Sequence, residues 1–246
     1  MAAFTLPAGF ENAAIVQVAM DVEAAPFLER TRAVGDAFAL GEAEFYPRVL
    51  ATASDEITIL LVRSKIGLVN AASALTVALS LVPAPRVIVS AGTAGGLRAD
   101  VNVGDLAVGT EYTYTDADAT AFGYEFGQVP GMPATYATEP ALLEKAQAAA
   151  AAYTGEGTPL LGQMLAGGSF VTAKNVKDTR EIFPQAISTD METTALAQIC
   201  ASRALPFIAV RGISDLCGPA ADQDFHMDAP IVAERSATLV TALLAL

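Results

Sequence analysis

The segment Val87-Ile-Val-Ser-Ala-Gly-Thr-Ala-Gly-Gly-Leu97 indicates the class of fold. It starts as a β-branched apolar run, typical of a buried strand, and passes directly into a glycine-rich turn. The uncharged stretch before it, Val69–Leu81, has the length of a buried helix, so a helix leads into the strand. Alternation of this kind predicts an α/β domain around a largely parallel or mixed sheet.

The same alternation continues on both sides of this segment. We expect strands at Ala14–Val18, Ile57–Arg63, Val87–Ala91, Asp105–Gly109, Pro159–Gly168, Ala186–Met191 and Phe207–Ile213. We expect helices at Ala24–Thr31, Val69–Leu81, Pro140–Ala152, Val176–Ile182, Thr193–Ala204 and Pro230–Leu246. No proline- or serine-rich linker, charge block or internal repeat interrupts the pattern, which favours a single domain.

The composition argues against a disordered chain, a nucleic-acid-binding protein and a membrane protein. The chain of 246 residues is 53% apolar and only 17% charged, which suits a folded core rather than a disordered chain. Its formal net charge of −13 leaves no basic footprint for nucleic acid or for an anionic membrane. The longest uncharged stretch, Ile66–Pro85, contains polar residues and a proline, and it predicts a buried helix rather than a membrane span.

Cysteine and histidine are scarce. Cys200 and Cys217 are too few for a disulfide framework or a cysteine-rich zinc site, and Cys200 lies in an apolar helical pattern typical of a core residue. His226 is the only histidine, which argues against a multi-histidine metal site. The N-terminal residues lack the basic and apolar regions of a signal peptide. We therefore expect a cytoplasmic protein without a metal or another cofactor.

Carboxylates occur where strands are expected to end, and ligands of open α/β sheets gather at those ends. In Ala186-Ile-Ser-Thr-Asp-Met-Glu-Thr-Thr-Ala195, Asp190 and Glu192 follow an apolar strand and precede a helix. One such acid can simply cap the helix or complement its dipole, a contribution of about 0.3–1 kcal/mol. Two acids around a methionine also fit a binding site, because a carboxylate accepts two hydrogen bonds from a vicinal diol such as that of ribose.

A further acid ends the apolar segment Phe207-Ile-Ala-Val-Arg-Gly-Ile-Ser-Asp215. Arg211 lies inside this run, and a buried charge is costly unless it is paired. Asp215 occupies a partly dry position at the end of the strand, which suits a general acid. A turn or N-cap aspartate would have the same position in the sequence.

Another acid pair opens the helix after the first expected strand, in Ala14-Ile-Val-Gln-Val-Ala-Met-Asp-Val-Glu-Ala24. Glu23 could act as a base toward water, or it could be a favourable acid of the first helical turn. The turn at Thr93–Gly96 offers backbone amides to an anion or water, although a purely structural turn has the same pattern. Separate carboxylates without a metal cluster indicate acid/base hydrolysis of an acetal-like bond, as in glycosidases.

The segment Glu111–Thr138 breaks the alternation. It is long, contains glycines and prolines, and carries six aromatic residues, Tyr112, Tyr114, Phe122, Tyr124, Phe126 and Tyr136. Long loops in compact domains are often functional, and exposed aromatic side chains favour contact surfaces. The alternative is a loop that packs over a small core of its own.

These motifs resemble those of a known family. DADATAFGYEFGQVPGMP from Asp116, TDMETTA from Thr189 and VRGISD from Val210 are similar to sequences of the 5′-methylthioadenosine/S-adenosylhomocysteine nucleosidases, which belong to the nucleoside phosphorylase superfamily. The resemblance implies a three-layer domain at residues 13–246, with a central twisted sheet, mixed and largely parallel, flanked by helices. Residues 1–12 would form an extension. The implied activity is hydrolysis of the N-glycosidic bond of methylthioadenosine or S-adenosylhomocysteine, which releases adenine.

By this resemblance, three carboxylates have distinct roles. Glu23 matches the glutamate that activates water, Asp215 the aspartate that protonates the adenine leaving group at N7, and Glu192 the glutamate that binds the ribose hydroxyls. The implied mechanism is dissociative. Negative charge builds on the purine beside Asp215, and Glu23 takes a proton from water that attacks an oxocarbenium-like carbon. Each such acid or base contributes roughly 10²–10⁴-fold to the rate.

Other matched positions are expected to contact the substrate. Arg211 and Thr93 correspond to residues that position the attacking water, and Phe170 and Val171 to residues that stack on and hydrogen-bond the purine. The remaining matches near the ribose, the purine and the 5′ group are Met20, Ile66, Met191 and Ser214.

The resemblance also implies a homodimer. Phe122 and Pro130 match residues that reach into the 5′-alkylthio pocket of a partner subunit, which would explain the aromatic segment. A small nucleoside is the other implied partner.

Three positions depart from the family pattern. Thr93 stands where serine is usual, so the hydroxyl survives; Asp190 replaces a more common glutamate; Thr115 replaces the histidine of some members. The run LCGPAADQDFHMDAP after Asp215 also differs, so the resemblance implies least about the cover over the purine.

Three alternative functions stay open at this level. A purine nucleoside phosphorylase of the same fold would need basic residues for phosphate near the glycine-rich turn, where Arg63 is the only nearby candidate. A hydrolase of another 5′-modified adenosine, such as 5′-deoxyadenosine or aminofutalosine, would share the base site. A non-catalytic nucleoside-binding protein would be expected to lose a catalytic carboxylate, yet Glu23 and Asp215 are both present.

Overall fold

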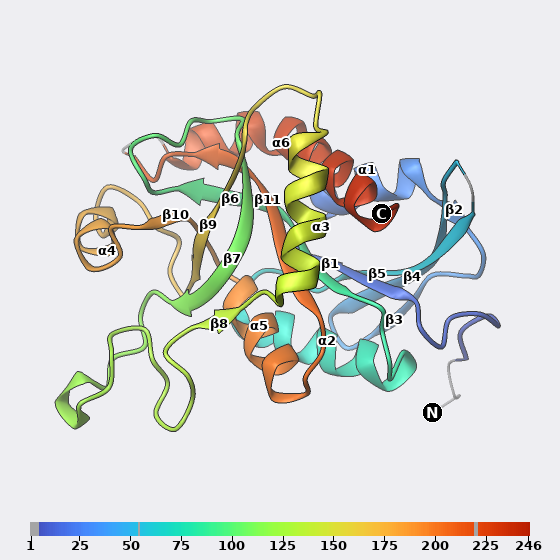
Figure 1. Cartoon of the computed structure of the whole chain (residues 1–246), viewed down its shortest axis with the longest axis horizontal. Coiled ribbons are helices and arrows are strands. Elements are labelled where there is room, and N and C mark those ends of the chain that lie inside the picture. The colour runs from blue at the N-terminus through green and yellow to red at the C-terminus, as the bar shows by residue number, and fades with distance from the viewer. Residues whose placement is uncertain (1–4, 54, 219–220) are drawn as a thin grey trace.

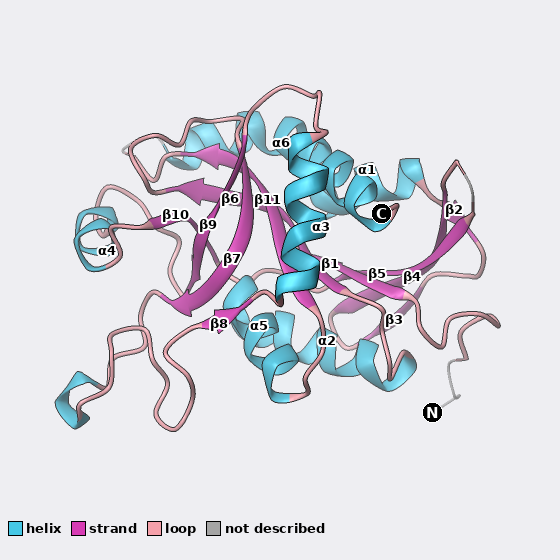
Figure 2. Ribbon diagram, viewed as in Figure 1, coloured by secondary structure: helices cyan, strands magenta, loops and turns pink. Residues whose placement is uncertain are grey.

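The chain folds into one α/β domain of three layers, a mixed sheet between two groups of helices (Figures 1 and 2). The computed structural model describes residues 5–53, 55–218 and 221–246, and for residues 221–228 it describes the backbone only. The mixed α/β class expected from the sequence is confirmed. Within the described residues, no helix combines the length and the apolar character needed to cross a membrane.

The centre of the sheet is parallel. Strand β1 (Ala14–Val18) lies between β5 (Glu56–Arg63) and β6 (Ile88–Gly96), and β6 also runs parallel to β11 (Phe207–Asp215). Every residue of β1 and β11 is buried, as expected for strands that are covered on both faces. Because parallel neighbours end at the same edge, their carboxyl ends bring distant segments of the chain together.

One half of the sheet closes on itself. After β11 the order continues through β7 (Leu106–Tyr114) and β9 (Pro159–Ala166) to β10 (Ala186–Asp190), and β10 returns to pair antiparallel with β6. The closing pairs are Ser188 with Gly96 and Thr189 with Gly95. This closure was not expected, since it depends on pairing between strands far apart in the sequence. It places the ends of β6, β10 and β11 around one space.

The opposite edge of the sheet is antiparallel. Strand β4 (Ala43–Ala51) pairs with β5 from Glu44 to Ala51, and the short strands β2 (Arg32–Ala33) and β3 (Phe38–Leu40) pair with β4. We predicted none of these three strands. Pro47 lies in the middle of β4, and a proline inside an apolar run argues against a strand unless it lies near a sheet edge.

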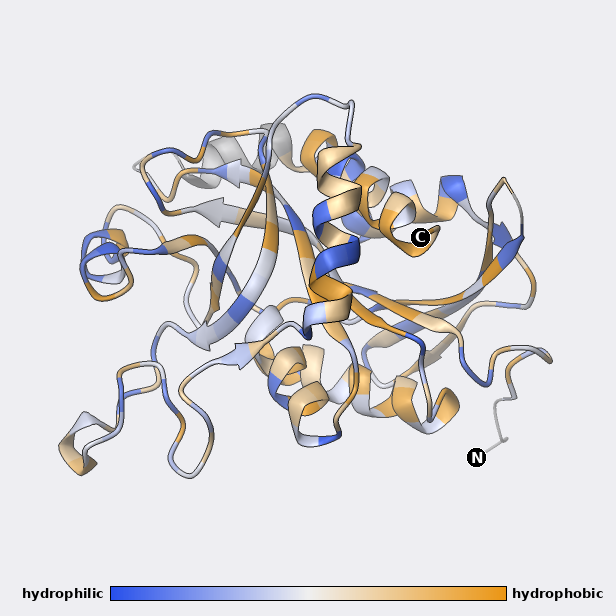
Figure 3. Cartoon of the chain, viewed as in Figure 1, coloured by the Kyte–Doolittle hydropathy of each residue, from blue (hydrophilic) through white to orange (hydrophobic). Residues whose placement is uncertain are grey.

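Helices cover both faces of the sheet. On one face lie α1 (Asp21–Arg30), α3 (Pro140–Ala151) and α6 (Ala221–Leu244), and on the other lie α2 (Leu68–Leu81) and α5 (Thr193–Ser202). In Figure 3 the apolar colour runs along the central strands and over much of the helices that cover them. The alternation of strand side chains divides the core in two, as in β1, where Ile15 belongs to one cluster and Val16 to the other.

Several boundaries differ from the sequence expectation. The glycine-rich segment predicted as a turn is part of β6, which continues to Gly96 because β10 and β11 hydrogen-bond to it on both sides. Strand β7 continues to Tyr114, and β8 (Tyr136–Ala137) pairs with it, so the irregular part of the aromatic segment is shorter than expected. Helix α6 begins at Ala221 rather than Pro230. Helix α4 (Val176–Ile182) has the predicted bounds.

Candidate active site

A pocket lies at the carboxyl ends of β1, β6, β10 and β11. It encloses about 610 Å³ of space not filled by atoms, part of it at the open mouth, which is within the range of small-molecule sites. Most predicted site residues line it, namely Met20, Glu23, Ile66, Thr93, Phe170, Val171, Met191, Glu192, Arg211, Ser214 and Asp215. The fold therefore gathers in one place residues from six separate segments of the chain.

Glu23 is buried in the first turn of α1 and both of its carboxylate oxygens accept hydrogen bonds. Oε2 accepts from the backbone N–H groups of Ala19 (2.9 Å) and Met20 (3.0 Å). Oε1 accepts from the backbone N–H (2.8 Å) and the hydroxyl (2.9 Å) of Thr93. We predicted that Thr93 and its turn would position water or an anion. In the structure, the backbone N–H and the hydroxyl of Thr93 hold the carboxylate of Glu23 instead.

The close approach of Glu23 to β6 requires a glycine. Gly92 has a φ of +126°, and a Cβ at this position would collide with the Glu23 carboxylate. No other residue type adopts this backbone conformation without strain. The glycine-rich segment therefore serves to bring α1 and β6 together.

Arg211 is buried at the centre of the site and contacts β6 and two carboxylates. Its guanidinium donates to the carbonyl of Thr93 and to the hydroxyl of Ser90, both at 2.9 Å. Nη1 lies 3.2 Å from Glu192 Oε2, and Nε lies 3.3 Å from Asp190 Oδ2. The Nε–Oδ2 contact lacks hydrogen-bond geometry and is an ion pair only. The neighbouring acids more than offset the effect of burial and raise the Arg211 pKa.

Glu192 is the second buried carboxylate of the Arg211 cluster. Its Oε1 accepts the backbone N–H of Gly67 at 2.8 Å. Burial, reinforced by the charges of Asp190 and Glu23 and opposed by Arg211, raises the pKa of Glu192 to about 7. A group of three acids around one arginine therefore favours binding a neutral or positively charged group over an anion.

Asp190 has a structural role, which was one of the two interpretations of its place in the sequence: it holds the start of a helix. Its Oδ1 accepts the backbone N–H groups of Glu192 and Thr193, both at 2.8 Å, at the start of α5. Side-chain acceptors at this position satisfy N–H groups that the helix leaves unpaired. Asp190 thus fixes the start of α5 and, with it, the position of Glu192.

Asp215 is buried at the end of β11. Its Oδ2 accepts the Ser214 hydroxyl at 3.0 Å, and its Oδ1 accepts the backbone N–H of Cys217 at 2.8 Å. Cys217 has a φ of +55°, an uncommon value for a residue other than glycine. Burial of the thiol raises the Cys217 pKa to about 12, so it stays a protonated thiol.

The two acids assigned opposite roles contact the same strand at different points. Glu23 bonds to Thr93, whereas a Cβ added to Gly95 would lie 3.2 Å from Asp215 Oδ1. Two residues of a strand span about 6–7 Å and face the same side of the sheet. The two carboxylates can therefore approach a ligand in the pocket from two points separated along β6.

Comparisons with known proteins agree with this geometry. Residues 13–245 match the sequence profile of the phosphorylase superfamily. A 5′-methylthioadenosine/S-adenosylhomocysteine nucleosidase of Geobacillus thermodenitrificans is 38% identical over 191 residues, which cover 77% of this chain and 80% of the relative. The chain belongs to this nucleosidase family.

Solved structures of the family have the same fold. The nucleosidase of Neisseria meningitidis in complex with methylthio-immucillin-A superposes with a TM-score of 0.88 and 33% identity, covering 95% of this chain and 99% of that one. The nucleosidase of Colwellia psychrerythraea in complex with adenine has a TM-score of 0.87 and 28% identity, covering 98% of this chain and 96% of that one.

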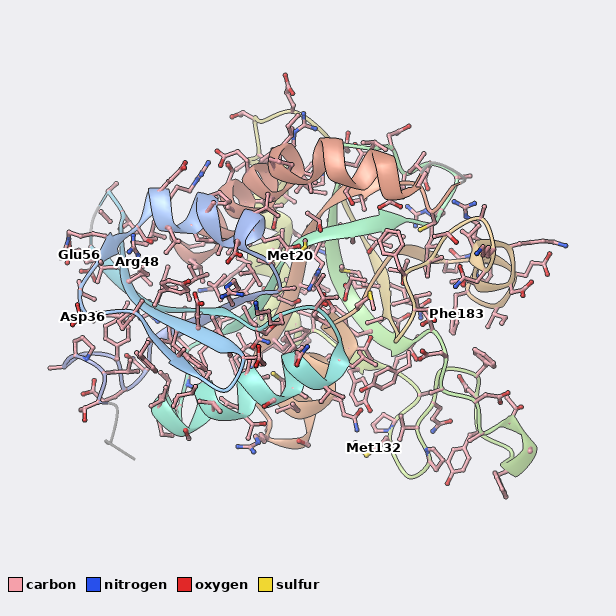
Figure 4. All side chains as sticks on the ribbon, turned by 180° about the vertical axis from the view of Figure 1, so that it is seen from behind. Met20, Asp36, Arg48, Glu56, Met132 and Phe183 are labelled. Atoms are coloured by element: carbon pink, nitrogen blue, oxygen red, sulfur yellow. The ribbon has the colours of Figure 1, made fainter. Side chains whose placement is uncertain are left out.

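Two predicted residues lie away from the pocket of this nucleosidase family member. Phe122, in a short 3₁₀ helix (Thr120–Phe122), and Pro130 are exposed on a loop that projects from the body of the domain (Figure 1). Figure 4 shows Met132, which lies on the same loop, well separated from Met20 at the start of α1. Most of the run expected to cover the purine, LCGPAADQDFHMDAP, lies outside the residues whose side chains are described.

Some pocket residues were missed by sequence reasoning. Ser169, Thr189 and Cys217 line the pocket but were given no role. Thr189 stands in the motif TDMETTA, one residue before Asp190, and the two-residue period of the strand could have shown which side chains of β10 share a face. Cys217 had no such signal, because its position depends on the backbone turn after β11.

Proposed function

We propose that this chain hydrolyses the N-glycosidic bond of 5′-methylthioadenosine, S-adenosylhomocysteine or both, and releases adenine and the 5-thio-substituted ribose. The observation that carries the proposal is the placement of the buried acids Glu23 and Asp215 at separate points along β6, with Glu192 beside Arg211 between β6 and α5. Membership of the nucleosidase family gives the substrate class.

The charge of the pocket suits a cationic transition state. Among its described lining residues, Glu23, Asp190, Glu192 and Asp215 are acids and Arg211 is the single basic group. Cleavage of an N-glycosidic bond builds positive charge on the ribose ring. Negative groups already fixed beside such a charge stabilise it without reorganisation.

The proposed roles follow from this arrangement. Asp215 protonates the purine leaving group, with Ser214 and the Cys217 N–H orienting its carboxylate. Glu192 accepts hydrogen bonds from the ribose hydroxyls, and Glu23 accepts a proton from the attacking water. Arg211 and Thr93 set the positions of the two glutamates. No metal or organic cofactor takes part in this proposal.

The same contacts disfavour a phosphorylase. A phosphate would need the donors of Thr93, which the Glu23 carboxylate already engages. Arg63, the candidate basic residue, forms ion pairs with Asp21 and Glu44 and is not among the residues lining the pocket. Two like charges 4 Å apart repel by about 4 kcal/mol at an effective dielectric constant of 20, so a dianion beside Glu23 is disfavoured.

A homodimer forms part of the proposal. Val69 and Phe122 are 81% and 83% exposed, and Ile66, which lines the pocket, is 49% exposed. A contact with a second copy would remove these apolar side chains from water. A second copy that places Phe122 and Pro130 over the first copy's Ile66 would complete the 5′ end of the pocket.

We also propose that the enzyme acts in the cytoplasm. Cys200 and Cys217 are both buried and neither forms a disulfide, in keeping with a reducing compartment.

The test of the activity is release of adenine from methylthioadenosine by the purified protein, first without phosphate and then with it. Release in phosphate-free buffer, together with free methylthioribose, is the expected result. Release only when phosphate is present would make the protein a phosphorylase. If methylthioadenosine releases no adenine in either buffer but 5′-deoxyadenosine or aminofutalosine does, the protein is still a hydrolase of the N-glycosidic bond, and its substrate has a different 5′ group.

A substitution distinguishes an enzyme from a nucleoside-binding protein. We expect Asp215→Asn to lower kcat by roughly 10²–10⁴-fold, because the amide cannot protonate the purine. The Tm and the circular dichroism spectrum of the variant serve as the control that the fold remains intact. Wild-type turnover in this variant would remove Asp215 from the mechanism.

A further inference from the structure

The hydroxyl of Thr189 stands out among the described polar groups of the pocket. Thr189 is only 5% exposed and lines the pocket, yet its Oγ1 has no hydrogen-bond partner among the described residues. A buried hydroxyl without a partner costs roughly 1–3 kcal/mol. Such a group is rare in a folded protein and calls for a reason.

The register of the sheet shows which way this side chain points. Thr189 lies directly opposite Gly95 in the antiparallel pair of β10 and β6, and opposed residues of such a pair project from the same face. A Cβ on Gly95 would point at Cys217 Sγ and Asp215 Oδ1. The Thr189 side chain is therefore on the Asp215 side of the pocket, where the leaving group is expected.

Ser188 provides the contrast. Its hydroxyl is also buried and unpartnered among the described residues, but Ser188 is not among the residues lining the pocket. It opposes Gly96, whose added Cβ would point at Leu216, Val101 and Ile213. Ser188 and Thr189 thus each have a buried hydroxyl without a described partner, on opposite faces of β10, and only Thr189 faces the pocket.

We propose that Thr189 is a further specificity-determining residue, whose hydroxyl donates a hydrogen bond to a ring nitrogen of the bound purine other than the one that Asp215 protonates. N1 and N3 of adenine are acceptors, and a threonine hydroxyl is a donor. When the base is bound, its nitrogen accepts the hydrogen bond that the Thr189 hydroxyl does not donate within the described protein. This inference rests on the proposed function for the identity of the ligand.

The experiment measures binding of free adenine by titration calorimetry, so it does not depend on turnover. Thr189→Val keeps the shape of the side chain and removes the hydroxyl; we expect adenine to bind about 5–10-fold more weakly, equivalent to about 1–1.4 kcal/mol. Thr189→Ser keeps the donor and should retain near wild-type affinity. Ser188→Ala is the matched control and should leave the affinity unchanged.

Adenine analogues identify the atom. With 1-deazaadenine and 3-deazaadenine, the analogue that lacks the contacted nitrogen should bind wild type and Thr189→Val equally well, because the interaction is already lost. With 7-deazaadenine, the wild type should keep its advantage. If Thr189→Val binds adenine as tightly as wild type, or if all analogues show the same ratio between the two proteins, the hydroxyl does not contact the base.

Thermal unfolding without ligand separates this role from a structural one. We expect Thr189→Val to be at least as stable as wild type, since an unpaired buried hydroxyl is replaced by a methyl group. A lowered Tm with unchanged adenine affinity would make Thr189 a structural residue. Failure of the wild type to hydrolyse methylthioadenosine, with adenine binding retained, would overturn the proposed function and leave this inference open to the same test.

Discussion

At the scale of single residues, the site is governed by how its carboxylates are held. Glu23 accepts four hydrogen bonds from protein donors, whereas Glu192 accepts one backbone N–H and contacts Arg211. Asp190 is committed to the start of α5. Of these three acids, Glu192 accepts the fewest hydrogen bonds from the protein, and its carboxylate is therefore the most available to a ligand.

The raised pKa of Glu192 predicts a pH dependence of stability. Its ordinary value is 4.5 and its value in the folded chain is about 7. Between these values the folded state holds a proton that the unfolded state has released, so the free energy of unfolding falls as pH rises. The contribution is complete below pH 4.5 and is lost as pH rises through 7.

Thermal unfolding of the ligand-free protein between pH 4.5 and 8 measures this effect. We expect the Tm of wild type to decline across the window relative to that of Glu192→Gln, whose side chain has the same size and no charge to desolvate. Parallel curves for the two proteins would show that another group is responsible.

At the scale of elements, the extension of β6 past its predicted end has the largest consequence for the site. A glycine-rich segment after an apolar run has the composition of a turn, but in the fold β10 and β11 pair with it on both sides. Glycine is needed at both positions, because a Cβ at Gly92 would collide with the Glu23 carboxylate and a Cβ at Gly95 with the sulfur of Cys217, close to Asp215. Sequence patterns could not reveal this, since the packing partners come from α1 and β11.

Gly92→Ala tests the contact between α1 and β6. An alanine there adopts an unfavourable left-handed conformation, which costs about 1–2 kcal/mol, and it also displaces the Glu23 carboxylate. We therefore expect a lowered Tm together with a fall in kcat of at least tenfold, measured with methylthioadenosine.

Gly41→Ala is the control for this variant. Gly41 has a φ of +64° with open space around its Cβ position and lies outside the pocket. It should lose stability through the strain of a positive φ alone and keep wild-type kcat. A Gly92→Ala protein with unchanged kcat would show that the Glu23 position tolerates movement.

At the scale of the whole molecule, the apolar side chains of Phe122 on the projecting loop and of Ile66 at the pocket are both exposed. The irregular segment between β7 and β8 carries Phe122, while Tyr112 and Tyr136, in the flanking strands, are core residues. The six aromatic residues predicted to share a role thus divide into core and loop. Tyr112 and Tyr136 belong to the central core of the domain rather than to a small core under the loop, and a contact role for the exposed Phe122 stays a prediction.

Phe122→Ser tests the proposed homodimer. Loss of this apolar contact should shift sedimentation in an analytical ultracentrifuge toward the monomer and raise KM for methylthioadenosine more than it lowers kcat, because the partner contributes to the 5′ pocket. Ile231→Ser removes another exposed apolar residue, 52% exposed on α6, and should change neither property. A wild-type protein that sediments as a monomer would overturn the proposal.

The sequence by itself determined the α/β class, most of the strands and helices, and the family. These follow from local patterns: apolar runs with a strand or helix period, glycines at their ends, and ordered motifs such as VRGISD. Only the tertiary structure decided that β6 closes onto β10, that the Thr93 donors belong to Glu23, and that Thr189 faces the pocket while Ser188 does not. Each of these depends on a contact between segments far apart in the chain, and local sequence patterns do not specify such contacts.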